Sequence, residues 1–286
     1  MSETSLASLV HAAAQRLGAA GVPDPLVDAE LLVGHVRGVR RGEVQAAMVR
    51  GDRASESERA ALDALVERRA AREPLQHITG TAPFRHLELA VGPGVFVPRP
   101  ETETVVQFAI DALVNAPEAE PVAVDLGTGS GAIALSMATE VPHSRVYATE
   151  LSPEAYAWAS RNTAGTPNLT LVNEDLADAF HELDGTVSVV ISNPPYVPDA
   201  AIPRDPEVRL FDPAMALYGG EDGLDIVRVL SMRALELLRP GGLLVIEHGE
   251  LQGEEIRSIL TRDGWRAAST HRDLTLRDRA TTALRP

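Results

Sequence analysis

The stretch from Val122 to Arg262 alternates short apolar runs with helical segments, and this alternation restricts the fold more than any other feature of the sequence. The apolar runs are rich in Val, Ile and Leu, as strands buried on both faces are. Repeats of a strand and a crossover helix form a parallel sheet covered by helices on both faces. We therefore expect an α/β domain with strands at Val122–Asp125, Arg145–Glu150, Leu169–Asn173, Val187–Ser192 and Gly242–Glu247, and helices near residues 131–139, 153–163, 223–238 and 251–262.

The first 80 residues follow a helical period. Apolar residues recur at spacings of three and four from Leu6 to Leu17, and again from Leu26 to Val36. A short third helix is expected over Gly42–Val49, and the Ser55–Glu58 segment fits a capping box that opens a longer fourth helix. The sequence therefore predicts a small helical domain at residues 1–80.

Between these two regions the period changes to two. Leu87, Leu89 and Val91 alternate with polar or small residues, and a Gly-Pro-Gly turn follows them. We expect a β-hairpin linker at residues 81–98, followed by the α/β domain at residues 99–286.

Several kinds of chemistry are excluded by residue types that the chain lacks. There is no Cys, which excludes disulfides, thiol nucleophiles and thiolate metal sites. All 26 basic residues are Arg, so a lysine Schiff base and a P-loop lysine are excluded as well. The eight histidines are scattered without the spacing of metal ligands, and no metal is expected.

The charge of the chain is strongly negative and unevenly distributed. The net charge is −15, with about −1 on residues 1–80 and about −14 on residues 81–286. A negative field repels phosphate backbones, so a protein or small-molecule substrate is favoured over DNA or RNA. No apolar run approaches the roughly 18 residues of a membrane span, and the first residues do not resemble a secretory signal. We expect a cytoplasmic protein that does not act at a membrane.

A glycine-rich turn follows the first expected strand of the α/β domain. Gly127, Gly129 and Gly131 let the backbone approach a ligand closely, and the helix that starts after them offers free N–H groups. The same spacing also fits the fingerprint of dinucleotide-binding enzymes. On this motif alone, a nicotinamide-dependent oxidoreductase stays open as an alternative.

Acidic residues stand near the ends of three successive strands. Asp125 directly precedes the glycines, where a carboxylate opposes a pyrophosphate but suits the cationic methionine end of S-adenosylmethionine (SAM). Glu150 ends the next strand, where it is placed to bind ribose hydroxyls. Asp175 follows the third strand and can hold an adenine amine, with Leu176 against the ring. These acids favour SAM over a dinucleotide.

The fourth strand ends in Asn193-Pro194-Pro195-Tyr196, at the edge of the sheet where ligands of open α/β folds bind. Proline fixes φ and has no N–H, so the carbonyls in this segment point in set directions. The Asn193 side-chain oxygen and the Pro194 carbonyl can together accept both hydrogens of a planar NH₂ group, while Tyr196 stacks on its face. Such a grip aims the nitrogen lone pair of an amide or an aromatic amine at a methyl donor.

These segments resemble the bacterial peptide-chain release factor glutamine N5-methyltransferases of the HemK/PrmC type, in order and over nearly the whole chain. The resemblance is carried by "FVPRPETE", "DLGTGSGAIALS", "ISNPPYVP", "GGEDGLDIVR", "LRPGGLLVIEHGELQ" and "RDLTLRDRA". The N-terminal segments "DAELLVGHV" and "EPLQHITG" are similar too. "NPPY" alone also occurs in enzymes that methylate amino groups of DNA and RNA, whereas "PRPETE" with the helical domain is far more specific.

The resemblance implies a Rossmann-like, class I SAM-dependent methyltransferase domain at residues 99–286 and a substrate-docking helical domain at residues 1–80. The implied reaction moves a methyl group from SAM to the side-chain amide of the glutamine in the Gly-Gly-Gln loop of a release factor, leaving S-adenosylhomocysteine. By matching position, the residues that would contact SAM are Gly127, Thr128, Gly129, Ser130, Gly131, Glu150 and Asn193, and those that would hold the glutamine are Asn193, Pro194, Pro195 and Tyr196. The family pattern also suggests a monomer.

Two further substrates stay open within the same chemistry, namely a glutamine of a ribosomal protein and a nucleic-acid base. The chain also departs from the family pattern at three positions. Glu150 stands where many relatives have Asp, His248 replaces a frequent Ile, and Leu276 stands where Gly is common. The first changes the reach of the carboxylate, and the other two concern local packing.

Overall fold

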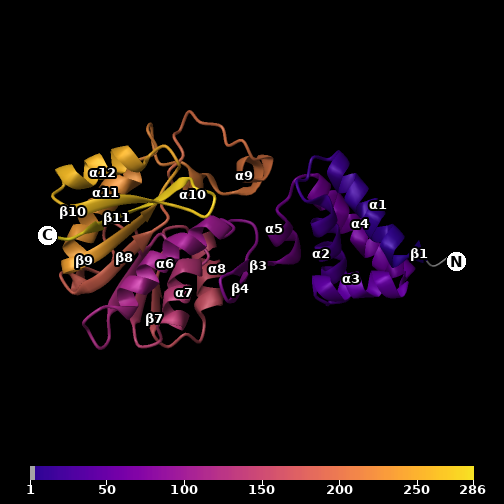
Figure 1. The fold of residues 1–286 in the computed structure, drawn as a ribbon, viewed down its shortest axis with the longest axis horizontal. Coiled ribbons are helices and arrows are strands. Elements are labelled where there is room, and N and C mark those ends of the chain that lie inside the picture. The colour runs from indigo at the N-terminus through magenta and orange to yellow at the C-terminus, as the bar shows by residue number, and fades with distance from the viewer. Residues whose placement is uncertain (1–3) are drawn as a thin grey trace. The chain divides into compact units, whose positions relative to one another are not determined.

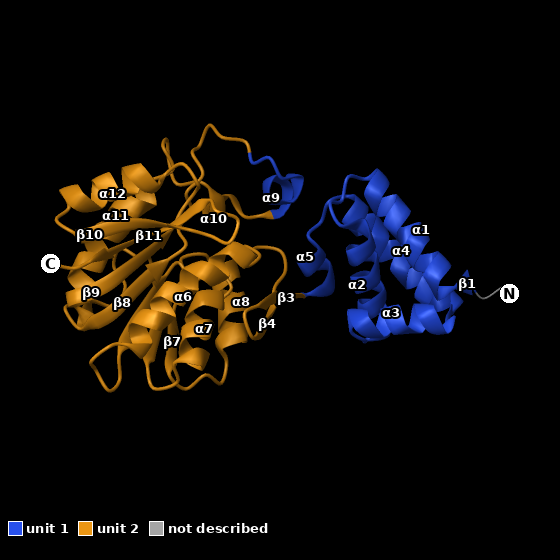
Figure 2. Cartoon of the chain, viewed as in Figure 1, with its two compact units in different colours: residues 1–80, 203–211 blue, residues 81–202, 212–286 orange. Residues whose placement is uncertain are grey.

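The computed structural model describes residues 4–286, which divide into two units (Figure 2). One unit is helical and comprises residues 4–80 together with residues 203–211; the α/β unit comprises residues 81–202 and 212–286. Each unit has an apolar core of its own. The chain therefore passes between the units at three points, after Gly80, Ile202 and Phe211.

The helical unit contains the helices that the apolar spacing predicts. They are α1 (Leu6–Ala19), α2 (Pro25–Arg37), α3 (Arg41–Arg50) and α4 (Glu56–Ala70), with the short α5 (Leu75–Thr79) and a pair of two-residue strands, β1 (Thr4–Ser5) and β2 (Arg53–Ala54). Leu6, Leu17, Leu32 and Leu62 are fully buried between the helices. The predicted capping box is confirmed, since the Glu58 N–H donates to the Ser55 hydroxyl and the Ser55 N–H donates to the Glu58 carboxylate.

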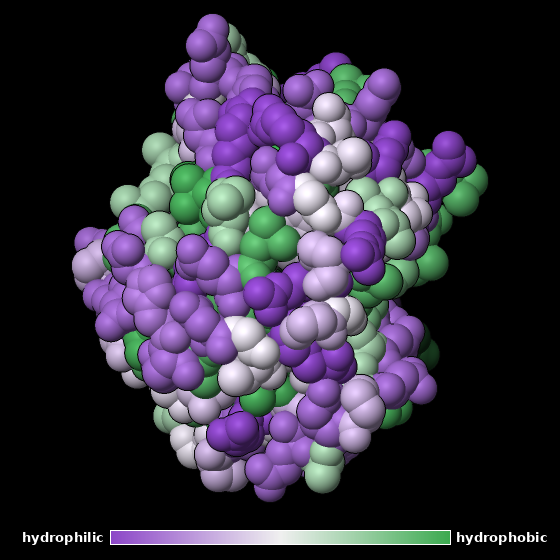
Figure 3. Space-filling model, turned by 90° about the vertical axis from the view of Figure 1, so that its left-hand side faces the viewer, coloured by the Kyte–Doolittle hydropathy of each residue, from purple (hydrophilic) through white to green (hydrophobic). Residues whose placement is uncertain are grey.

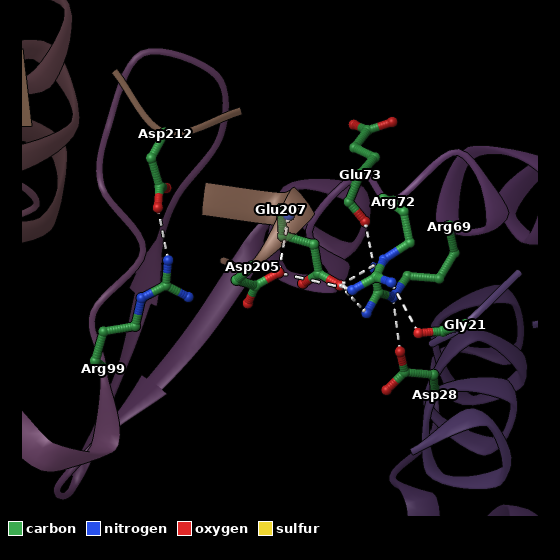
Figure 4. A network of polar contacts seen from close by, with 9 residues as sticks. All are labelled: Gly21, Asp28, Arg69, Arg72, Glu73, Arg99, Asp205, Glu207 and Asp212. Carbon is green, nitrogen blue, oxygen red and sulfur yellow. Dashed lines mark hydrogen bonds and ion pairs between the residues drawn. The ribbon is translucent and has the colours of Figure 1, made fainter. Parts of the chain in front are cut away.

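Helix α9 (Pro206–Phe211) belongs by its contacts to the helical unit, although the sequence analysis places it in the α/β domain. Arg69 on α4, whose side chain is only 5% exposed, donates to Asp28 at 2.7 Å and to Glu207 on α9 at 2.8 Å. Arg72 also pairs with Glu207, at 2.9 Å, and lies 3.6 Å from Asp205 (Figure 4). A buried guanidinium needs such partners, and α9 supplies one of them.

The α/β unit is built on a seven-stranded sheet in the order β10-β11-β9-β8-β5-β6-β7. The five predicted strands are present as β5 (Val122–Leu126), β6 (Arg145–Thr149), β7 (Leu169–Val172), β8 (Val187–Ser192) and β9 (Leu238–Glu247), and all five are parallel. The next strand along the chain after β7 is β8, which lies on the other side of β5. The two halves of the parallel sheet therefore diverge between β5 and β8, which is where open α/β sheets bind ligands.

Helices cover both faces of this sheet (Figure 1). One face packs against α6 (Pro100–Val114), α7 (Ala132–Glu140) and α8 (Pro153–Thr163), and the other against α11 (Asp225–Leu237) and α12 (Gly253–Arg262). Alternate residues of the central strand point to opposite faces, with Ala123 in the first core and Val122 and Val124 in the second. Continuous apolar strands are thus explained by burial on both sides.

Two antiparallel strands, β10 (Arg266–Arg272) and β11 (Asp278–Leu284), complete the sheet and were not predicted. Antiparallel neighbours need only a short turn, so no helix announces them in the sequence. Asp273 builds this turn by accepting hydrogen bonds from the Thr275 and Arg277 N–H groups. Leu276 adopts a φ of 65° in the same turn, a left-handed conformation that glycine adopts more readily than leucine.

The predicted hairpin is present, but it is shorter than expected. Strands β3 (Thr81–Phe84) and β4 (Leu87–Ala90) pair with each other, and residues 95–97 are not part of a strand. A short 3₁₀ helix (His181–Leu183) precedes β8. After β8, a long connection that contains α9 and the short α10 (Ala214–Leu217) leads to α11. This connection begins with the Asn-Pro-Pro-Tyr segment.

The side of the α/β unit shown in Figure 3 is largely hydrophilic, and its hydrophobic residues form small groups separated by hydrophilic ones. Within residues 4–286, no helix combines the length and apolar composition needed to cross a bilayer.

Candidate active site

The predicted site residues follow the carboxyl ends of neighbouring strands. Asp125 on β5 is paired with Ala148 on β6 and with Ile191 on β8, each one residue before its strand ends. The glycine turn, Glu150 and Asn193 therefore leave the sheet at the same edge. This edge lies at the point where the two halves of the parallel sheet diverge.

The glycine turn leaves open space above its backbone. Gly127, Gly129 and Gly131 have φ values of 79°, 59° and 85°, which side-chain-bearing residues rarely adopt. A Cβ added at Gly127 or Gly129 would meet no atom within 4 Å, whereas one at Gly131 would lie 3.2 Å from Thr163. The first two glycines thus expose backbone to a ligand, and the third allows close packing against α8.

Asp125 is fully buried beneath this turn. Its Oδ2 accepts hydrogen bonds from the Thr128 hydroxyl at 2.5 Å and from the Ala134 N–H at 3.1 Å, while Oδ1 has no partner. Burial raises the pKa of the Asp125 carboxyl to about 7 against the effect of these hydrogen bonds, and nearby Glu150 adds to the rise. Asp125 therefore holds the turn with one oxygen, while its other oxygen is buried without a hydrogen-bond partner.

Glu150 is also held by backbone donors. Its carboxylate accepts from the Gly129 N–H and the Ser152 N–H, both at 2.8 Å, and burial raises its pKa. Glu150 thus touches the glycine turn directly. Ser130, on the same turn, is buried and accepts through its carbonyl from the Asn162 side chain.

The third acidic position is less enclosed. Asp175 is exposed three residues after β7, and one of its oxygens accepts from the Ala177 N–H at 3.0 Å. Leu176 is partly buried and packs against the apolar cluster that includes Tyr147 and Phe180. Asp175 and Leu176 thus lie beyond the outer strand of the parallel sheet, farther along its edge than Glu150.

The Asn193–Tyr196 segment is fixed from its far side. The Gln252 side chain donates to the Tyr196 carbonyl at 2.9 Å, and the Val197 N–H donates to the Leu217 carbonyl at 2.8 Å. Among the described residues, the carbonyls of Asn193 and Pro194 accept no backbone hydrogen bond. The backbone therefore leaves these two carbonyls available as acceptors, whereas the Tyr196 carbonyl is engaged by Gln252.

Two glycines of the "GGEDGLD" segment make this packing possible. A Cβ at Gly219 would lie 2.4 Å from the Pro195 carbonyl oxygen, and one at Gly223 would lie 2.3 Å from the Tyr196 oxygen. No side chain fits at either distance. The structure thus gives a physical reason for a motif that the sequence analysis used only as a resemblance.

Tyr196 is suited to hold a group rather than to remove a proton from it. The residue is partly exposed, yet burial of the phenol and repulsion by Glu247 raise its pKa to about 12. The phenol therefore stays protonated at neutral pH and cannot act as a base.

Glu247 is a site residue that the sequence analysis missed. It ends β9, is 1% exposed, and its Oε2 has no hydrogen-bond partner. Burial raises the pKa of the Glu247 carboxyl to about 7. This rise is opposed by the Thr102 and Asn193 side chains, which lie against the carboxyl, and by the charge of Arg279. The available signal was the carboxylate at the end of a fourth parallel strand of the same sheet.

His248 follows Glu247 but is occupied structurally. Its Nε2 bonds to the Thr281 hydroxyl at 2.8 Å and its Nδ1 lies 2.9 Å from the Gly249 carbonyl. Burial lowers the pKa of the His248 ring. Thr281 thus provides a hydrogen-bond partner for this buried histidine.

One group of candidate metal ligands is present among residues 4–286, and it lies outside this site. The ligand atoms of His181, Asp184 and Glu236 come within 4.8 Å of one another on the surface. Arg233 already pairs with Asp184 at 2.7 Å and with Glu236 at 2.6 Å. The two carboxylates therefore already share one guanidinium as an ion-pair partner.

Comparison with known proteins shows which family has this combination of units. Residues 8–80 match the PrmC N-terminal domain, and residues 87–227 match the methyltransferase small domain. The chain is 51% identical to a release factor glutamine methyltransferase of Streptomyces coelicolor, and the match covers 96% of both chains. This chain belongs to the release factor glutamine methyltransferase family.

Other members of the release factor glutamine methyltransferase family are similar over the same length. The protein of Bifidobacterium longum is 46% identical over 96% of this chain and 97% of its own. A 4-amino-L-phenylalanine/4-methylamino-L-phenylalanine methyltransferase of Streptomyces pristinaespiralis is 42% identical over 77% of this chain and 76% of its own. A solved methyltransferase of Pyrococcus furiosus, with a TM-score of 0.50 and 22% identity over 69% of this chain and 88% of its own, shares the fold.

Proposed function

We propose that this protein transfers a methyl group from SAM to the side-chain amide nitrogen of the glutamine in the Gly-Gly-Gln loop of a peptide-chain release factor. The observation that carries the proposal is the Pro194 carbonyl, which accepts no backbone hydrogen bond and lies next to Asn193 at the same edge of the sheet as the open glycine turn. Family membership and full-length similarity to release factor glutamine methyltransferases support the substrate.

The residues at the glycine turn fit SAM. Open space above Gly127 and Gly129 admits a ligand against the backbone, and Thr128, Ser130 and Gly131 complete the turn. Asp125, buried directly beneath the turn, would favour the cationic methionine end through its carboxylate charge, and Glu150 offers an acceptor for ribose hydroxyls. Asp175 and Leu176 would hold the adenine. When bound, SAM supplies a methyl group made electrophilic by its positively charged sulfur.

The Asn193–Tyr196 segment would hold the acceptor glutamine. An amide nitrogen is a weak nucleophile because its lone pair is delocalised into the carbonyl. When Asn193 and Pro194 accept its two hydrogens, the nitrogen is held in place with its lone pair aimed toward the cofactor side. Pro195 and Tyr196 would line the side of the glutamine, with Tyr196 as a neutral aromatic surface.

The helical unit would help to dock the release factor, and residues 1–80 carry almost no net charge, in contrast to the rest of the chain. We also place the enzyme in the cytoplasm as a monomer that acts on a protein and not directly on nucleic acid, in keeping with the net charge of −15.

A second candidate substrate is an aromatic amine. The Streptomyces pristinaespiralis relative acts by its name on 4-amino-L-phenylalanine, whose aromatic NH₂ group has a delocalised lone pair, as an amide NH₂ group does. The acceptor pair at Asn193 and Pro194 fits both groups. The match to the PrmC N-terminal domain favours the release factor for this chain.

The test is to incubate the protein with methyl-labelled SAM and a full-length release factor, and to analyse the loop peptide by mass spectrometry. We expect one added methyl group on the loop glutamine and none on a release factor whose glutamine is replaced by alanine. Parallel reactions contain 4-amino-L-phenylalanine, ribosomal proteins and RNA. An unmodified loop together with methylation of any of these would overturn the proposal.

A further inference from the structure

The proposed grip requires one orientation of the Asn193 amide. The oxygen and the nitrogen of an asparagine side chain have nearly the same shape, but only the oxygen accepts hydrogen bonds. If the NH₂ end faced the substrate, two donors would meet and the grip would be lost. A neighbouring group must therefore distinguish the two ends.

Glu247 is in position to do so. In the parallel pair of β8 and β9, Ser192 is opposite Ile246, and Asn193 and Glu247 are the next residues on each strand. The Asn193 side chain lies against the Glu247 carboxylate, which is 1% exposed. Because Oε2 has no hydrogen-bond partner, this buried oxygen is still free to accept one.

Thr102 approaches the same carboxylate from the first turn of α6. It is the threonine of "PRPETE" and is 4% exposed. Its hydroxyl likewise has no hydrogen-bond partner within normal distance. Three motifs that are far apart in the sequence thus meet at one carboxylate.

We propose that Glu247 is a positioning residue, whose carboxylate accepts from the Asn193 NH₂ and so turns the Asn193 oxygen toward the substrate nitrogen. This inference rests on the proposed function. An ionised carboxylate only accepts hydrogen bonds, so it selects the NH₂ end of the asparagine. Thr102 donates its hydroxyl to the same carboxylate and holds it in place.

The role of Glu247 depends on its protonation. When protonated, Glu247 can donate to the Asn193 oxygen and compete with the substrate for it. Three charged or titratable groups surround the Glu247 carboxyl. Glu101 on α6 raises the pKa of Glu247 and Arg279 on β11 lowers it, and the third group is the Tyr196 phenol. The Arg279 side chain donates hydrogen bonds to the Asp273 carboxylate and to the His248 carbonyl. With a pKa of about 7, Glu247 changes state within the working range of an enzyme.

The test compares Glu247→Gln with Glu140→Gln, which makes the same chemical change at the far end of α7, where Glu140 pairs with Arg85. Glutamine can present either its oxygen or its NH₂ to Asn193, so the selection is lost. We expect kcat for the release factor to fall about 10- to 100-fold in Glu247→Gln, since misorientation of a reacting group costs rates of this order. The affinity for SAM and KM should change little, and Glu140→Gln should keep the wild-type kcat.

The pH profile separates positioning from a general structural effect. At saturating SAM, wild-type kcat should rise as the pH passes through about 7, and this rise should be absent in Glu247→Gln. Should Glu247→Gln not fold, the wild-type profile and the Thr102→Val variant, with an expected smaller loss in kcat, serve instead. A flat wild-type profile from pH 5.5 to 8.5, or a Glu247→Gln variant with wild-type kcat, would overturn the inference. Wild-type enzyme that leaves the release factor unmethylated would instead refute the proposed function.

Discussion

Replacing the buried Asp125 carboxyl by an amide should stabilise the α/β unit at high pH and not at low pH. The pKa of this carboxyl is about 7 in the folded protein, against an ordinary value of 3.8. A group whose pKa is raised by folding binds its proton more tightly in the folded state. Its contribution to stability is therefore greatest at low pH and is lost as the pH rises through about 7.

The size of the effect follows from the two pKa values. Between pH 5 and pH 8, ionisation of Asp125 should lower the free energy of unfolding by about 2–3 kcal/mol. In Asp125→Asn the side-chain oxygen can still accept from Thr128 and Ala134, while its NH₂ group takes the place of the unpaired Oδ1. An unpaired amide costs about 1–3 kcal/mol, but this cost is the same at both pH values.

The assay is urea unfolding of wild type and Asp125→Asn at pH 5 and pH 8, without SAM. Both tryptophans, Trp158 and Trp265, lie in the α/β unit, so fluorescence reports on this unit. The stability of the variant relative to wild type should increase by about 2–3 kcal/mol from pH 5 to pH 8. Glu247 titrates in both proteins, so its contribution cancels in the difference between their free energies of unfolding. An equal difference at both pH values would mean that Asp125 titrates normally and would refute this reasoning.

Three further predictions concern other parts of the structure. Gly223→Ala should lower kcat by about 10-fold or more because the new Cβ would displace the Tyr196 carbonyl. The control Gly165→Ala has a similar φ but open space around the new Cβ, so it should cost only about 1–2 kcal/mol of stability and keep the wild-type kcat. Arg69→Met breaks a buried ion pair and should destabilise the helical unit by about 3–5 kcal/mol and speed proteolysis of residues 203–211. The control Arg16→Met breaks an exposed ion pair and should lower the free energy of unfolding by less than about 1 kcal/mol. Burial alone would raise the pKa of Asp273, but hydrogen bonds from Thr275 and Arg277 lower it to about 2. Asp273→Asn should therefore be less stable than wild type at pH 7. In acid-unfolding experiments, this difference in the free energy of unfolding should shrink as the pH falls below about 4.

The parts of the fold that could be predicted from the sequence are those with local signals. Strands β5 and β8 are largely apolar because both of their faces are buried, and the capping box at Ser55 and Glu58 needs only four residues. The position of Asn193 at a strand end follows from the same local pattern. The antiparallel strands β10 and β11 have mixed burial and no such signal.

What could not be predicted depends on contacts between distant residues. Arg69 and Glu207 are 138 positions apart, and nothing in either segment distinguishes this pair from exposed ones such as Arg16 and Asp63. Glu247 reads in the sequence as the last residue of a strand. Its importance follows from burial against α6 and from an unpaired oxygen, which only the folded structure shows.

The central claim is that Asn193 and Pro194 hold the acceptor nitrogen, and one measurement tests it most directly. Methyl transfer to a release factor and SAM binding are measured side by side for wild type and Asn193→Ala. We expect the transfer rate to fall at least about 100-fold while SAM still binds, because the grip on the nitrogen is lost and the glycine turn is intact. A variant that methylates the loop glutamine at close to the wild-type rate would contradict the claim.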